Sequence, residues 1–336
     1  MKKRHYPELD AFKGACALLV VFAHVISQYP DSSRALSIVF DVVYSFHMPA
    51  FILISGFCAA KVLDFSSSAD FFAFLRGRFL RLMVPYFVWA AIYTPLRIVM
   101  NDSARVPYVF ADAWQIFLGY NPDGAMWFLC ALFIGTVISC LGIRALGLGW
   151  SLGIACVLLF LTECRVIVTP SFLHFGYSHL FTVLFYFLLG LSLNGAYGRL
   201  RASNGHVVLF LVCTLVFAIA NVARLSKVLS WNCGILTGVS GSVVLWGLVV
   251  VLTRVSTVNS ALVALGGFAM EIYILAEPIK VGIRLLQGKS CSCTLLSVSL
   301  MFFLAVVGAF VLAKVIHRMP LAATILFGTP RKVQRK

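Results

Sequence analysis

The chain has 336 residues, of which 61% are hydrophobic and only 12% are charged. A water-soluble domain carries about 45–50% apolar and about 25% charged residues, so this composition excludes a soluble protein and predicts one transmembrane domain over residues 1–336. The net charge is +15. The Lys and Arg residues are scattered between apolar runs, which is typical of cytoplasmic loops in a membrane protein and does not indicate nucleic-acid binding.

The first predicted span, residues 9–28, carries ionisable side chains. An apolar run leads from Lys13 to His24, and an ionisable group inside a bilayer is costly enough to indicate a functional site. On a helix, Lys13 and His24 share nearly one face, about 16 Å apart along the axis. Asp10 lies about 40° from that line. We therefore expect a polar face on this helix.

Apolar windows of about 20 residues predict an all-α fold with about ten transmembrane helices. The predicted spans cover residues 9–28, 38–60, 83–100, 125–143, 150–168, 178–197, 206–223, 231–253, 260–284 and 294–317. No internal repeat is visible, so an inverted-repeat transporter architecture has no support from the sequence.

The distribution of basic residues predicts the orientation. An even number of spans puts both termini on one side, where the loops hold more Lys and Arg than those opposite. The positive-inside rule then predicts a multi-pass protein of the plasma (inner) membrane with cytoplasmic termini. Residues 319–336 would form a short basic cytoplasmic tail.

A basic, aromatic-rich segment over residues 66–81 follows the second span and predicts a short helix at the cytoplasmic interface. Arg78 and Arg81 are three residues apart and share a face of that helix. They could serve only as topological anchors. Alternatively, the two guanidinium groups could bind phosphate, because arginine forms bidentate bonds to phosphate oxygens.

His47 is a second histidine within a predicted span, beside Pro49. It could simply be satisfied by a neighbouring main-chain carbonyl, or it could share a polar cavity with His24. Trp127, at the start of the fourth span, could belong to an interfacial aromatic belt or to a site. Glu271 and Glu277 lie in the ninth span, and each carboxylate needs a basic or hydrogen-bonding partner there.

Cysteine usage gives little evidence for a metal site. Most of the ten cysteines lie in or near apolar runs, where cysteine packs as a small apolar residue. Only Cys291 and Cys293 fall in a polar connection, and such a pair without a second pair or a nearby His is weak evidence for metal. We predict no metal.

Several stretches resemble the acyltransferase 3 family of integral membrane O-acyltransferases, in the family's order along the chain. They are Leu9-Asp10-Ala11-Phe12-Lys13-Gly14 with His24, Phe46-His47-Met48-Pro49 with Ser55-Gly56-Phe57, Arg78-Phe79-Leu80-Arg81-Leu82-Met83-Val84-Pro85-Tyr86, Met126-Trp127-Phe128-Leu129 with Ala131-Leu132-Phe133, and Ile272-Tyr273-Ile274-Leu275-Ala276-Glu277-Pro278.

The chain departs from the family pattern at two places. Lys13 stands where the family has Arg, which keeps the charge but loses the bidentate geometry. The His of the family's late Ile-Tyr-Leu-Leu-His-Pro segment is absent, and Ala276 or Glu277 occupies its neighbourhood. A mechanism that depends on that late His therefore cannot be transferred to this chain.

The resemblance implies transfer of an acyl group, usually acetyl, from acyl-CoA to a hydroxyl of a carbohydrate or cell-envelope glycan or glycolipid. Acetyl-CoA would be the donor substrate. The protein would also bind the carbohydrate or glycolipid acceptor, and it would lie in a lipid bilayer. An imidazole can remove the hydroxyl proton or carry the acyl group itself, and we assign this role to His24. The other assigned roles are a cation-orienting carboxylate at Asp10, a positive charge near a CoA phosphate or the oxyanion at Lys13, phosphate binding at Arg78 and Arg81, and an acceptor channel lined by His47, Trp127, Glu271 and Glu277.

Two rival functions remain open at this point. A transporter or flippase would use buried charges to relay protons or to bind a glycan or small solute, although repeats and paired broken helices are not visible. A catalytically silent membrane sensor or scaffold would be consistent with Lys13 and the missing late His.

Overall fold

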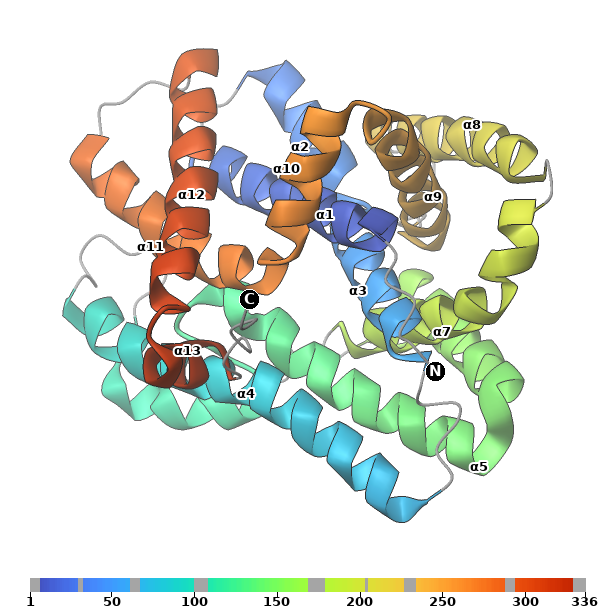
Figure 1. The fold of residues 1–336 in the computed structure, drawn as a ribbon, viewed down its shortest axis with the longest axis horizontal. Helices are drawn as coiled ribbons and strands as arrows, with labels where there is room; N and C mark the ends of the chain where they lie inside the picture. The colour runs from blue at the N-terminus through green and yellow to red at the C-terminus, as the bar shows by residue number, and fades with distance from the viewer. Residues whose placement is uncertain are drawn as a thin grey trace. The chain divides into compact units, whose positions relative to one another are not determined.

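The computed structural model describes residues 7–29, 33–60, 67–99, 108–168, 179–202, 205–226, 234–287 and 294–328. Within these ranges every regular element is helical (Figure 1), which confirms the predicted all-α class. The helices are α1 (Pro7–Ile26), α2 (Arg34–Tyr44), α3 (His47–Cys58), α4 (Ser68–Val99), η3 (Phe110–Leu118), η4 (Gly124–Met126), α5 (Trp127–Glu163), α7 (Leu180–Ala202), α8 (Gly205–Leu225), α9 (Gly234–Leu252), α10 (Ser256–Gly266), α11 (Ala269–Gln287), α12 (Leu295–Ile316) and α13 (Pro320–Phe327).

A multi-pass membrane fold is confirmed, but the predicted number of spans is not. In the described part of the chain, seven helical segments are long and apolar enough to cross a membrane, or eight if α10 and α11 form one bent span. The apolar part of α7, Leu180–Ala196, is shorter than a full span. Two predicted spans, 125–143 and 150–168, fall in α5, whose backbone leaves the helical conformation at Gly147 (φ 80°, ψ 165°). Only glycine adopts that conformation readily.

The predicted interfacial helix is not a separate element. Residues 68–81 and the following span form one continuous helix, α4, of 32 residues with Pro85 and Pro95 inside it. The sequence predicted two elements here, an interfacial helix over residues 66–81 and a span over residues 83–100, and in the fold they are one helix.

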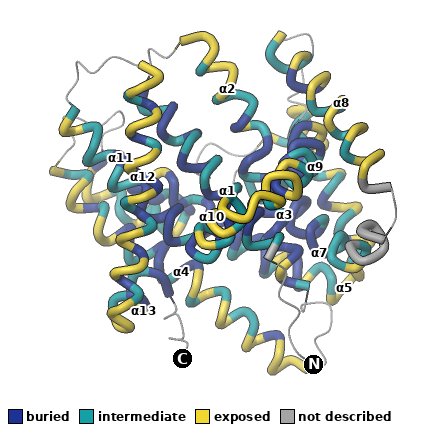
Figure 2. The backbone as a smooth tube through the Cα atoms, turned by 45° about the horizontal axis from the view of Figure 1, so that its top comes forward, coloured by how far each residue is buried: buried dark blue, intermediate teal, exposed yellow. Residues whose placement is uncertain are grey.

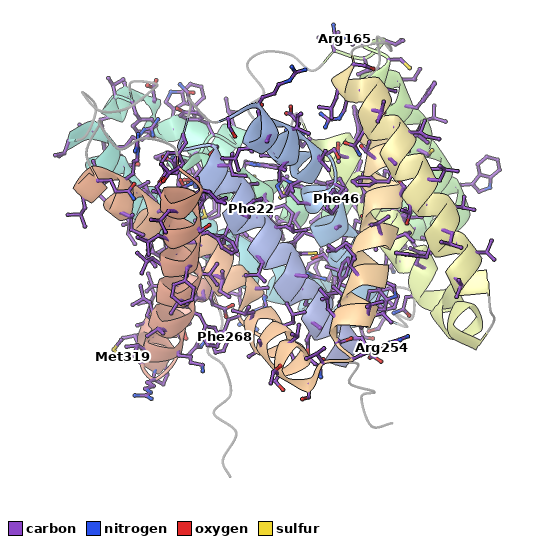
Figure 3. The ribbon with its side chains drawn as sticks, turned by 90° about the horizontal axis from the view of Figure 1, so that it is seen from above. Phe22, Phe46, Arg165, Arg254, Phe268 and Met319 are labelled. Atoms are coloured by element: carbon purple, nitrogen blue, oxygen red, sulfur yellow. The ribbon has the colours of Figure 1, made fainter. Side chains whose placement is uncertain are left out.

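The ninth predicted span, 260–284, is broken into α10 and α11, which meet at an angle of 80°. The break follows Gly266 and Gly267, and sharp kinks in helices are common at such small-residue pairs. Phe268, labelled in Figure 3, lies at the break and contacts Phe310 of α12, with 5.3 Å between ring centroids. The break changes the direction of the chain immediately before the segment that carries Glu271 and Glu277.

The chain divides into two compact units, residues 1–55 with 193–314, and residues 56–192 with 315–336. In the first unit, α1 packs against α2, α9, α10 and α11 (Figure 1). Figure 2 shows α1 mostly buried, whereas α8 and α12 expose one face. The exposed faces carry apolar side chains such as Leu211, Leu215 and Phe303, as expected of helices that contact lipid.

Two kinds of contact hold α1 in the first unit. Aromatic rings meet between Phe12 and Trp246 of α9, and between Phe22 and Phe302 of α12, with centroids 5.4 and 5.7 Å apart. Glycines allow the backbones of α1 and α10 to touch, since a Cβ on Gly266 would collide with the main-chain oxygen of Asp10. Small residues serve this purpose in membrane helix packing.

In the second unit, α4 packs against α5, η3 and α13. Tyr86 of α4 donates its hydroxyl to the carbonyl oxygen of Ile116 at 2.8 Å, and Trp89 donates its indole N–H to that of Leu326 at 3.1 Å. Thus Pro320–Phe327, within the region predicted as a tail, forms α13, whose Phe327 side chain is buried. Residues 329–336 lie outside the described residues, and the tail stays a prediction.

Candidate active site

The ionisable residues of α1 lie in two places: Asp10 and Lys13 are in its first half, and His24 is near its end. The helix is continuous from Pro7 to Ile26, so Lys13 and His24 are separated by about 16 Å along its axis. Lys13 donates from Nζ to Oδ1 of Asp10 at 3.0 Å, and both side chains are partly exposed. The first half of α1 therefore presents a local ion pair, and His24 lies in a different environment near the other end.

His24 faces a carboxylate from a distant part of the chain. Its Nδ1 atom lies 3.8 Å from Oε2 of Glu277 on α11, and the two side chains are 24% and 18% exposed. Both side chains are therefore partly exposed within this unit. The predicted requirement that Glu277 have a basic partner is thus met by α1, which α11 contacts.

Lys280 completes this arrangement, and the sequence reading did not single it out. Its Nζ atom lies 2.6 Å from Oε2 of Glu277 and donates to the main-chain oxygen of His24 at 3.1 Å. The side chain is 2% exposed. The available signal was the spacing of three residues between Glu277 and Lys280 inside an apolar span, which puts opposite charges on one helix face.

His47 lies in the first unit as well, at the start of α3. It is 1% exposed, and its Nδ1 atom lies 2.9 Å from the main-chain oxygen of Val43. Because a carbonyl oxygen only accepts, Nδ1 carries the proton and Nε2 is left as an acceptor. The ring of Tyr44 contacts His47, with 4.9 Å between ring centroids. The contacts described above join His24, Glu277 and Lys280, and we call these three residues the histidine–carboxylate cluster.

Glu271, predicted beside Glu277 in the acceptor channel, is buried in the first turn of α11. An acidic residue there is stabilised by the positive end of the helix dipole. Its spacing of six residues from Glu277 puts the two carboxylates about 120° apart around α11. The histidine–carboxylate cluster therefore contains Glu277 and not Glu271.

The remaining predicted site residues belong to the second unit. Arg78 and Arg81 lie on α4, where the Arg78 guanidinium sits 5.3 Å from the centre of the Phe74 ring. Neither arginine forms an ion pair with an acidic side chain in the described part of the chain. Two cations on one face without a carboxylate partner suit a phosphate ligand, and the alternative of membrane anchoring stays open.

Trp127 begins α5, and its ring lies 4.7 Å from that of His179, just before α7. Asp123 fixes the preceding turn by accepting a hydrogen bond from the main-chain nitrogen of Ala125 at 3.0 Å. The sequence reading did not identify His179. Trp127 and His179 are far apart in the sequence, and only the fold brings their rings into contact.

Among the described residues, no group of three His, Cys, Asp or Glu side chains could hold a metal ion. Cys291 and Cys293 lie outside the described residues.

The histidine–carboxylate cluster has the parts of a general-base site. A carboxylate on the Nδ1 side of an imidazole fixes the ring's tautomer and orientation and leaves Nε2 to take a proton from a hydroxyl. Catalytic hydrogen bonds are often long until a substrate binds, which suits the 3.8 Å separation of His24 and Glu277. A multi-pass helical protein with such a cluster is an integral membrane enzyme in its architecture and chemistry.

The comparison with protein families names the class of enzyme. The model of the acyltransferase domain of the acyltransferase 3 family matches residues 6–316, nearly the whole chain, and the chain belongs to this family. It is a membrane acyltransferase, and this membership supports acyl transfer over the transporter or flippase considered from the sequence. Neither a curated protein nor a solved structure matches the chain.

Proposed function

We propose that this acyltransferase moves an acyl group, in particular acetyl, from acyl-CoA to a hydroxyl group of a carbohydrate or cell-envelope glycan or glycolipid. The observation that carries the proposal is the contact between His24 and Glu277, which joins a base to an orienting carboxylate. A hydroxyl acceptor needs such a base because it attacks a thioester poorly while it keeps its proton.

In the proposed reaction, Nε2 of His24 accepts the proton of the acceptor hydroxyl while the oxygen bonds to the thioester carbonyl carbon. The carbon–sulfur bond then breaks, and the imidazolium returns the proton to the departing thiolate of CoA. Glu277 stabilises the transient imidazolium from the Nδ1 side. A variant of the scheme, in which His24 first carries the acyl group itself, uses the same residues.

The distance between Lys13 and His24 along α1 favours one of the two roles considered for Lys13. An ammonium about 16 Å along the axis from His24 is too far away to stabilise the oxyanion at the atom that His24 serves. Its position suits a phosphate of CoA, whose long pantetheine arm separates its phosphates from its thioester. Arg78 and Arg81 would bind CoA phosphates as well, since CoA is cytoplasmic and basic loops mark the cytoplasmic side.

The acceptor-binding roles that the sequence assigns to His47, Trp127 and Glu271 remain part of this proposal. The protein would reside in the plasma (inner) membrane with both termini in the cytoplasm, as the distribution of Lys and Arg predicts. A fluorescent protein fused to the C-terminus should then be protected from external protease in intact spheroplasts. Degradation of the fused protein under those conditions would reverse the proposed orientation.

The proposed function is tested with membranes that contain the wild-type protein or His24→Asn, supplied with radiolabelled acetyl-CoA. We expect label in a glycan or glycolipid fraction with wild type and a loss of about 10²-fold or more with His24→Asn, the usual contribution of a general base. His317→Asn, a histidine outside the cluster, is the matched control and should keep the wild-type rate. Full transfer by His24→Asn would overturn the proposal, and absence of labelled product with wild type would favour a sensor or scaffold.

A further inference from the structure

Lys280 is more deeply buried than His24 and Glu277, the two residues that it contacts. Its side chain is 2% exposed, against 18% for Glu277 and 24% for His24. The imidazole and the carboxylate are therefore partly exposed, whereas protein atoms enclose the ammonium. A buried ammonium is expensive unless it is paired and hydrogen-bonded, so its neighbours must supply that compensation.

Both neighbours of the Lys280 ammonium belong to the cluster. An ammonium has three donors and no acceptor, and Nζ directs donors to Oε2 of Glu277 at 2.6 Å and to the main-chain oxygen of His24 at 3.1 Å. One atom thus binds the carboxylate that faces the imidazole and the backbone that carries the imidazole. The two contacts fix the position of Glu277 relative to His24.

A simple tether between α1 and α11 is the alternative role for Lys280. Other groups already connect these segments, because Tyr29 donates its hydroxyl to Oε1 of Gln287 at 3.2 Å and its ring lies 5.2 Å from the Arg284 guanidinium. In the described part of the chain, the ion-pair partners of Glu277 are His24 and Lys280. Several groups therefore hold these two segments together. Of these groups, Lys280 is the one that hydrogen-bonds to the Glu277 carboxylate.

We propose that Lys280 is a positioning residue for acyl transfer, which holds the carboxylate of Glu277 on the Nδ1 side of His24 without touching the reacting atoms. The inference rests on the proposed role of His24 as the base. It predicts that Lys280 affects the rate through Glu277, and that it contributes little to the binding of acyl-CoA.

The test measures kcat and the KM for acetyl-CoA in nanodiscs of the full chain for Lys280→Met, Lys280→Arg, Glu277→Gln and the double variant. We expect Lys280→Met to lower kcat by about 10- to 100-fold with KM within about twofold, the pattern of a lost transition-state interaction. Lys280→Arg, which restores the charge, should recover part of kcat. The double variant should be no slower than Glu277→Gln alone, because residues that act through one another are not additive.

Tyr29→Phe is the matched control, because it removes a different bond between the same two segments. It should lower the melting temperature and leave kcat unchanged. Losses of kcat that multiply in the double variant would overturn the positioning role, as would a Lys280→Met protein that melts earlier but turns over at the wild-type rate. If Glu277→Gln is too slow to measure, equal kcat values for Lys280→Met and Lys280→Arg overturn it instead.

The two proposals can fail separately. Full activity of His24→Asn would refute the proposed base, whatever the Lys280 variants do. An inactive His24→Asn together with multiplying losses at Lys280 and Glu277 would refute the positioning role alone.

Discussion

The imidazole of His24 on α1 and the carboxylate of Glu277 on α11 face each other, with 3.8 Å between Nδ1 and Oε2. Glu277 lies in the segment where the chain departs from the late His of its family. In the fold, this segment supplies an acidic partner to the histidine of the first span. A carboxylate on the Nδ1 side of an imidazole orients the ring and stabilises the imidazolium that forms during proton transfer.

The first prediction separates the two glutamates of α11. Glu277→Gln should lower kcat by about 10²-fold or more, because the amide cannot stabilise the imidazolium by its charge. Glu271→Gln should cost less, since its side chain lies outside the histidine–carboxylate cluster. Initial rates at saturating acetyl-CoA, normalised to folded protein, make the comparison. A larger loss for Glu271→Gln than for Glu277→Gln would mean that Glu271, and not Glu277, supplies the catalytic carboxylate.

The second prediction concerns the arginines of α4. Arg78→Ala and Arg81→Ala should each raise the KM for acetyl-CoA by about 10-fold, the equivalent of one charge-assisted hydrogen bond of about 1.5 kcal/mol. Arg76→Ala is the matched control on the same helix, because Arg76 points away from the face that Arg78 and Arg81 share. Its KM should stay at the wild-type value. If all three variants bind acetyl-CoA normally, the pair serves as a membrane anchor.

The third prediction tests the departure at Lys13. Lys13→Arg restores the family's residue and can keep the ion pair with Asp10, so activity should stay within about threefold of wild type. Lys13→Met should raise the KM for acetyl-CoA by about 10-fold through loss of a contact with phosphate. Steady-state kinetics over a range of acetyl-CoA concentrations separates the two parameters. A fall in kcat with unchanged KM for Lys13→Met would place its charge at the oxyanion instead.

Composition and hydropathy predicted the class of fold correctly because they depend on the length of apolar runs, which a bilayer imposes directly. They failed where the predicted interfacial helix and the following span are one helix, α4, and where a predicted span breaks after Gly266 and Gly267. In both places packing between helices decides the outcome, and a local pattern does not contain it.

The candidate site was predictable only in part, for a similar reason. The cost of burying a charge identified His24 and Glu277 separately, but nothing in the sequence joined them. Lys280 was not predicted as a site residue, and its spacing from Glu277 does not by itself assign a role, because a Lys in a span can also extend its ammonium to the membrane surface. Its role emerges from the contact of α11 with α1, which brings its ammonium to the main-chain oxygen of His24.

The fourth prediction tests the close approach of α1 and α10. A Cβ on Gly14 would collide with the main-chain oxygen of Leu262, and one on Gly266 with that of Asp10. Because backbone atoms cannot rotate away, Gly14→Ala and Gly266→Ala should each destabilise the protein by about 1–3 kcal/mol. Thermal unfolding in detergent, followed by tryptophan fluorescence, should show a lower melting temperature.

Gly282→Ala is the matched control for these variants. Gly282 lies inside α11 in the same unit, and nothing lies within 4 Å of the position a Cβ would take. Alanine there should be neutral or stabilise by about 0.5–1 kcal/mol, because glycine is a poor helix former. Equal melting temperatures for Gly266→Ala and Gly282→Ala would mean that α1 and α10 do not touch backbone to backbone.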